Sequence, residues 1–300
     1  MQVIKNIVSR NMKKYIRDKA AVFFSFLSVL IVLFLYLIFL GDMQVDSIKS
    51  AIKDMPNFLD REKEVVFMVN SWLVAGLLAV NAITIPLGIL SMKVEDKYNK
   101  IEDDFNATPA KRYQIVMGYI ISAWIIGIVT SLFVLVIGEG YILIKGGSLL
   151  SLLGLLKVLG IISLSTIMFS GMFYLIVMFL KTVTQVSTIN TLVGTFSGFL
   201  GGIYVPIGVL GVGIGSVIKL FPLAHSVALL RQVFMEDSIS AVFSGTPSGT
   251  AEEIREFYGV DLFLGSHLMT PLEMILIMVG FTIICYGVSF ILFKKLKRNS

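Results

Sequence analysis

The chain has 300 residues, of which 56% are hydrophobic and 15% charged, and its mean hydropathy is +0.87. This composition excludes a water-soluble globular domain, because the apolar stretches of such a domain are broken by its own polar surface. The formal net charge of +5 does not indicate nucleic-acid binding, since basic and aromatic residues are not interleaved on a soluble face. The sequence predicts an all-α membrane protein.

Six long apolar stretches dominate the sequence. A helix needs about 20 apolar residues to cross ~30 Å of hydrocarbon, so we interpret each stretch as one transmembrane helix of a single membrane domain, residues 1–300. The predicted spans are residues 21–40, 67–92, 113–138, 158–180, 184–203 and 271–293.

Lys and Arg are distributed unequally across these spans. On the side of the two termini, 16 of them lie in residues 1–20, 93–112, 181–183 and 294–300. On the other side, 8 lie in residues 41–66, 139–150 and 204–270, which are longer in total. Because Lys and Arg resist translocation, both termini are predicted to be cytoplasmic.

Residues 1–20 precede the first span and have an apolar stripe at helical spacing, opposite a basic face. This pattern predicts an interfacial amphipathic helix that lies in the headgroup layer. The alternative is a positive flank that only fixes the orientation of the first span.

The connection after the second span also has a helical pattern. Val94, Tyr98, Ile101 and Phe105 recur at helical spacing among charges of both signs, which predicts an amphipathic helix over residues 93–108 on the cytoplasmic side. Thr108, which precedes Pro109, is expected to cap the next helix. This helix either rests on the membrane surface or docks a soluble partner.

Residues 204–270 form the predicted outer segment. Its first part is rich in glycine and is interrupted by Pro206. Irregular backbone at membrane depth persists only where protein or a water-filled cavity covers it, so we expect two short helices that dip back into the outer leaflet. The alternative is an extracellular loop with a surface helix, and His225 is expected to be a satisfied interface residue rather than a ligand.

In order and spacing, several motifs resemble the permeases of type-2 ATP-binding-cassette (ABC) exporters over nearly the whole chain. The chain departs from that family's pattern in lacking a glycine after the acidic pair and a second proline after Pro206. The motifs are Glu95-Asp96, TPAKRYQIVMGYII at 108–121, Ser197-Gly198 with Tyr204 and Pro206, and Phe221-Pro222 with Arg231.

The resemblance implies a complex of two permease protomers, identical or different, with two separate ABC ATP-binding subunits. ATP and Mg²⁺ are expected on those subunits, because this chain has no G-x-x-x-x-G-K-[ST] motif. We expect no catalytic, cofactor or metal site here, and no enzyme activity. The expected location is a cytoplasmic membrane of the bacterial type, where the chain contacts membrane lipid and no nucleic acid.

The predicted function is ATP-driven export of an amphipathic or hydrophobic substrate: a drug, in multidrug resistance, an antimicrobial peptide or a lipid-like molecule. The alternative is a non-transporting membrane scaffold or sensor subunit that recruits a cytoplasmic partner.

Three sets of residues are predicted to carry this function. For the candidate pathway or dimer contacts, helix packing is the favoured interpretation and substrate contact the alternative, because small and hydroxylated residues commonly serve helix packing in lipid. The ATPase-coupling set is Tyr98, Ile101, Glu102, Phe105, Thr108, Pro109 and Arg112. The candidate pathway or dimer contacts are Asn81, Thr84, Asn190, Thr191 and Thr195. The outer re-entrant set is Tyr204, Pro206, Pro222, His225 and Arg231.

Overall fold

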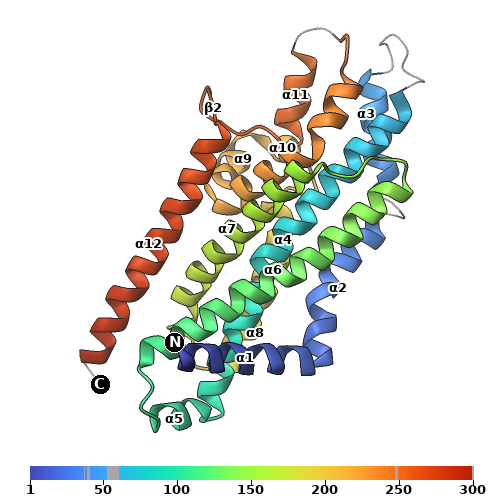
Figure 1. Ribbon diagram of the computed structural model, residues 1–300. Coiled ribbons are helices and arrows are strands. Elements are labelled where there is room, and N and C mark those ends of the chain that lie inside the picture. Colours follow the sequence, from blue (N-terminus) through green and yellow to red (C-terminus); the bar gives the residue numbers. More distant parts are fainter. Residues whose placement is uncertain (37, 39–40, 53–60, 247–248, 299–300) are drawn as a thin grey trace.

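In the computed structural model of the protein, residues 1–36, 38, 41–52, 61–246 and 249–298 are described (Figure 1). These residues form α-helices, one 3₁₀ turn and a single short hairpin. The predicted all-α membrane fold is therefore confirmed.

Four helices in the described part of the chain are long and apolar enough to cross a membrane. Two further pairs of consecutive helices meet this criterion together but are bent, by 79° and by 87°, so the number of spans is four, or up to six. The four are α4 (Glu62–Tyr98), α6 (Arg112–Ile144), α7 (Leu152–Val177) and α12 (Pro271–Arg298). The bent pairs are α1 (Gln2–Arg17) with α2 (Lys19–Leu35), and α9 (Gly211–Leu220) with α10 (Pro222–Val242).

Helix α8 (Val183–Leu200) occupies the predicted fifth span. Its threonines, Gln185 and Asn190 make it more polar than the other long helices, and it does not meet the criterion by itself. The count of six spans, with their boundaries, stays a prediction.

Helix α4 lies at the centre of the bundle and packs against α6, α7, α8 and α10 (Figure 1). It is apolar on all sides, which is typical of a buried helix, and its side chains are buried almost continuously from Val65 to Met92. Glycine allows the closest approaches: a Cβ at Gly138 of α6 would lie 2.5 Å from Val74 Cγ1.

The remaining elements gather at the two ends of the bundle. Helices α1 and α5 lie at the same end as both chain termini, and the other elements at the opposite end (Figure 1). This arrangement agrees with one cytoplasmic and one outer end. The short elements are α3 (Gly41–Ile52), α5 (Ile101–Asn106), the 3₁₀ turn Ile207–Leu210, α11 (Thr250–Phe257), β1 (Phe263–Leu264) and β2 (His267–Leu268).

The prediction of one helix over residues 93–108 is wrong. Helix α4 continues without interruption to Tyr98, and the short helix α5 begins only at Ile101. Between them, Lys100 adopts a left-handed conformation with φ 61°, which no helix interior accommodates. Helical spacing persists across this break, so the sequence pattern did not show it.

The predicted cap of the third span is also wrong. Lys111, not Thr108, precedes the first turn of α6, and its backbone N–H donates to Gln114 Oε1 at 3.0 Å. The Thr108 hydroxyl instead donates to the carbonyl of Phe105 at 2.7 Å, which closes the end of α5. Pro109 then lies in the connection between α5 and α6.

We expect single cysteines, in a Cys285→Ala background, to report the orientation. Because Lys and Arg are concentrated at the α1–α5 end, a cysteine at the exposed position Asp104 should be shielded from an impermeant thiol reagent in intact cells. A cysteine at the exposed position Glu253, at the opposite end, should be labelled. Labelling of position 104 but not 253 would reverse the topology.

Candidate functional site

A buried ionic cluster joins α1, α4 and α6. Asp96, near the end of α4, is fully buried and accepts two hydrogen bonds from the Arg10 guanidinium of α1, at 2.6 and 2.9 Å. The Tyr119 hydroxyl of α6 donates to the same carboxylate, and Lys14 Nζ lies 3.2 Å from it. A bidentate, charge-assisted pair of this kind fixes geometry as well as charge.

Helix α1 packs along α6 beside this cluster. Asn11 Nδ2 donates to Ser122 Oγ at 3.1 Å in a buried contact. Ile7 lies so close to Gly118 that a Cβ there would be 2.5 Å from Ile7 Cγ2. The stripe predicted to face lipid therefore packs largely on protein, although Ile16 remains 65% exposed.

Helix α5 is attached to both α1 and α4. The Arg10 guanidinium lies over the Phe105 ring, 5.2 Å from its centroid, in cation–π contact. Glu102 forms an ion pair with Lys93 of α4 at 3.6 Å. The connection between α4 and α6 is thus held against the bundle at two points.

The structure divides the predicted coupling residues into two groups. Ile101, Glu102 and Phe105 are half-buried within the assembly of α1, α4 and α5. Tyr98 is 62% exposed. The other exposed members of the set are Thr108, Pro109 and Arg112.

Sequence reasoning missed the partners of Asp96. The acidic pair Glu95-Asp96 directly follows an apolar run, and the N-terminal helix is strongly basic, so both halves of the signal are present in the sequence. Nothing in the spacing showed that Arg10 and Tyr119 reach the same carboxylate, because they lie 86 and 23 residues away from it.

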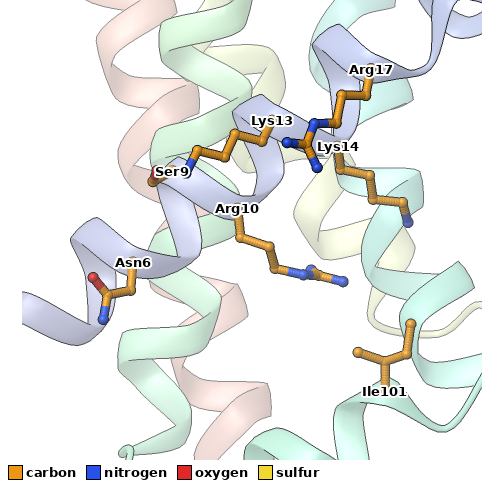
Figure 2. Close-up of a pocket in the computed structure, with 7 residues that line it drawn as sticks. All are labelled: Asn6, Ser9, Arg10, Lys13, Lys14, Arg17 and Ile101. Atoms are coloured by element: carbon orange, nitrogen blue, oxygen red, sulfur yellow. The ribbon is translucent and has the colours of Figure 1, made fainter.

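A basic groove of about 600 Å³ opens between α1 and α5 (Figure 2). All of its lining residues except Ile101 come from α1, and no acidic side chain is among them. The lining residues are Asn6, Ser9, Arg10, Lys13, Lys14, Arg17 and Ile101.

A second cavity of about 430 Å³ lies between α6, α7 and α12 and is almost entirely apolar. The largest lining side chain from each helix is Trp124 from α6, Tyr174 from α7 and Tyr286 from α12. It is therefore suited to a hydrophobic or amphipathic molecule.

The candidate pathway residues of α4 make contacts within the chain. Asn81 is buried, and its Nδ2 donates to Ser131 Oγ of α6 at 2.8 Å. Thr84 donates to the carbonyl of Val80, one turn earlier on α4. This geometry agrees with the packing alternative for both residues.

The candidate residues of α8 are placed differently. Asn190 is half-buried and donates to Ser91 Oγ of α4 at 3.4 Å. Thr191 and Thr195 are exposed and share one face of α8 with Thr184 and Thr188, which are also exposed. Residues at this spacing lie above one another on a helix, so a stripe of threonines faces away from the bundle.

The outer re-entrant residues surround a buried arginine. Arg231 of α10 is fully buried, and its Nη2 donates to the carbonyls of Gly201 and Gly202 at 3.0 and 2.9 Å. Its guanidinium lies over the Trp72 ring, 4.9 Å from the centroid. Arg231 therefore joins the end of α8 to α4. Trp72 of α4 also donates to the carbonyl of Tyr258 at 3.0 Å, which connects α4 to the segment after α11.

The other members of that set also lie in this region. Tyr204 packs edge-on against Phe199, with ring centroids 5.0 Å apart. Pro206 is buried, Pro222 occupies the first turn of α10 and His225 is buried one turn later. The bend of 87° between α9 and α10 falls at Phe221. With 21 residues, α10 is longer than the short helix predicted there.

The comparison with protein families identifies the chain. A family model described as ABC-2 type transporter matches residues 2–235, which is most of the chain. A search of the curated proteins gives no match.

We expect Asp96→Asn to destabilise the protein strongly. The substitution leaves Arg10 and Lys14 beside a neutral amide, and breaking a buried pair in this way costs about 3 kcal/mol. Glu95→Gln is the matched control, because Glu95 is partly exposed and its contact with Lys14 is worth about 0–1 kcal/mol. The melting temperature in detergent should fall clearly for Asp96→Asn alone, and equal melting temperatures would contradict the role of the cluster.

We expect Gly202→Ala to destabilise the outer segment. Gly202 has φ +60°, and a Cβ there would lie 2.7 Å from Ile207 Cγ1. The left-handed conformation alone costs a non-glycine residue about 1–2 kcal/mol. Gly215→Ala is the control, since no atom lies within 4 Å of that Cβ. A lower melting temperature is expected only for Gly202→Ala, and a loss equal to that of the control would show that the turn is not constrained.

Proposed function

The chain belongs to the ABC-2 type transporter family, and on this premise we propose that it is the membrane-spanning permease subunit of an ATP-driven exporter. A separate ABC ATP-binding subunit would hold ATP and Mg²⁺ and would dock at the α1–α5 end. The observation that carries the proposal is that α4 is one continuous helix. Its last residue, Tyr98, is exposed, whereas its middle is buried among the other helices.

Force applied at α5 would reach the centre of the bundle through α4. This helix has 37 residues, so at 1.5 Å per residue it is about 55 Å long and crosses the whole domain. Tyr98 at one end is exposed, whereas Trp72 near the other end is fully buried against Arg231. A partner that moves α5 therefore acts on the helix that touches most of the others.

The ionic cluster would make this connection stiff. Asp96 lies two residues before Tyr98 and is held by Arg10 of α1, while Lys93 pairs with Glu102 of α5. Because α1, α4 and α5 are bonded to one another, the partner would move them together rather than bend the connection between α4 and α5.

The threonine face of α8 supports the proposal of a second permease protomer. Thr184, Thr188, Thr191 and Thr195 are exposed in the single chain, and small hydroxylated side chains are enriched where helices meet in lipid. We assign this face to the dimer interface, or to the pathway between the two protomers.

The apolar cavity between α6, α7 and α12 supports an amphipathic or hydrophobic substrate. Its walls contribute aromatic and aliphatic side chains and no charged residue. A drug, an antimicrobial peptide or a lipid-like molecule has the matching chemistry, and export of such molecules would confer resistance.

Tyr98→Asp tests the coupling role. An exposed aromatic side chain that anchors a partner is worth at least ~2 kcal/mol, or about 30-fold in affinity. We expect normal membrane abundance and an unchanged melting temperature, but loss of the co-purified ABC ATP-binding protein and of ATP-dependent export in vesicles.

Leu264→Asp is the matched control, because Leu264 is 54% exposed and lies in β1, which pairs with β2 at the opposite end of the bundle (Figure 1). It should retain the ATP-binding subunit. If Tyr98→Asp also retains that subunit at full stoichiometry, the segment is not the coupling site. If the unaltered chain binds the ATP-binding subunit but moves no substrate in vesicles, it is instead a scaffold or sensor.

A further inference from the structure

The basic groove between α1 and α5 has cationic residues that the ionic cluster does not use. Arg10 and Lys14 are directed towards Asp96, and Lys14 also contacts Glu95. Lys13 and Arg17 line the same groove and are exposed. In the part of the chain that the structure describes, neither has a carboxylate within 4.0 Å.

The acidic residues near the groove are already engaged or do not line it. Glu102 pairs with Lys93. Asp18 accepts a hydrogen bond from the backbone of Ala21, where it caps α2. Asp103 and Asp104 of α5 are exposed and are not among the lining residues. The groove therefore presents uncompensated positive charge.

Neutral donors complete the site. The Ser9 hydroxyl and the Asn6 amide lie on the same face of α1 as Lys13 (Figure 2). A guanidinium, an ammonium, a hydroxyl and an amide together suit the several acceptor oxygens of one phosphate group. The volume of about 600 Å³ falls within the ~300–1,000 Å³ of small-ligand sites.

The position of α1 indicates where that phosphate comes from. Helix α1 is bent by 79° from the apolar helix α2, so it lies near the plane of the membrane surface if α2 crosses the bilayer. Ile16, directly before Arg17, is 65% exposed. An apolar side chain therefore stands beside the basic ones, in the arrangement that an interfacial helix offers to a headgroup and its acyl chains.

We infer that this groove binds the phosphate group of an anionic phospholipid, with Lys13 and Arg17 as its charged ligands. The bound lipid would cover the open side of α1, whose other sides are held by α6 and by the Asp96 cluster. Such a lipid would stabilise the α1–α4–α5 assembly that the proposed function uses for coupling. The inference itself needs only a membrane protein and does not rest on transport.

The test uses the purified whole chain in a neutral detergent with fluorescent phosphatidylglycerol as the probe. Lys13→Gln/Arg17→Gln should weaken binding on the order of 30-fold, since each basic residue near an anionic membrane contributes about fivefold. Lys5→Gln/Lys19→Gln removes two α1–α2 charges outside the groove and should leave binding nearly unchanged. Equal binding by both variants, or equal loss in both, would overturn the site.

Competition distinguishes the source of the phosphate. Unlabelled phosphatidylglycerol should displace the probe, whereas phosphatidylcholine, glycerol 3-phosphate and inorganic phosphate should not do so at the same concentration. Displacement by the two soluble phosphates would assign the groove to a soluble anion and refute the lipid. Loss of the co-purified ATP-binding protein in Lys13→Gln/Arg17→Gln, with phosphatidylglycerol binding intact, would assign it to an acidic protein surface instead.

Discussion

The buried carboxylate of Asp96 is the constraint on which the α1–α5 end of the molecule depends. A carboxylate without solvent is tolerated only when it is paired and hydrogen-bonded, and here Arg10, Lys14 and Tyr119 supply those contacts from α1 and α6. To satisfy one charge, three helices that are distant in sequence must meet at fixed positions. Helix α1 is held in this way across the bundle, and Arg10 in turn supports Phe105 of α5.

A second buried charge fixes the opposite end by different means. Arg231 faces backbone carbonyls and the ring of Trp72 rather than a carboxylate. Because its partners belong to the turn after α8 and to α4, a shift of α4 would change the surroundings of a fully desolvated guanidinium. Helix α4 is thus tied to a buried ion near each end, through Asp96 and through Trp72.

Composition and periodicity were sufficient for the fold class and for the four long apolar helices, because hydrophobic runs act locally. They were not sufficient for the site. The break at Lys100 depends on one left-handed residue inside a continuous helical pattern, and the Asp96 cluster joins residues 86 positions apart. Likewise, Asn81 has the same polar character whether it faces a pathway or, as found, Ser131 on α6.

The split of the connection into α5 and the end of α4 has a consequence for how a partner would be sensed. Had residues 93–108 formed one helix lying across the surface, a push on it would have reached α4 only through a flexible joint. Instead the exposed Tyr98 is the last residue of α4 itself, and the groups next to it, Asp96 and Lys93, are bonded to α1 and α5. A partner at Tyr98 would therefore act directly on the end of α4, which its neighbours clamp, so a displacement there would have to be shared by all three helices or would break the buried ion pair.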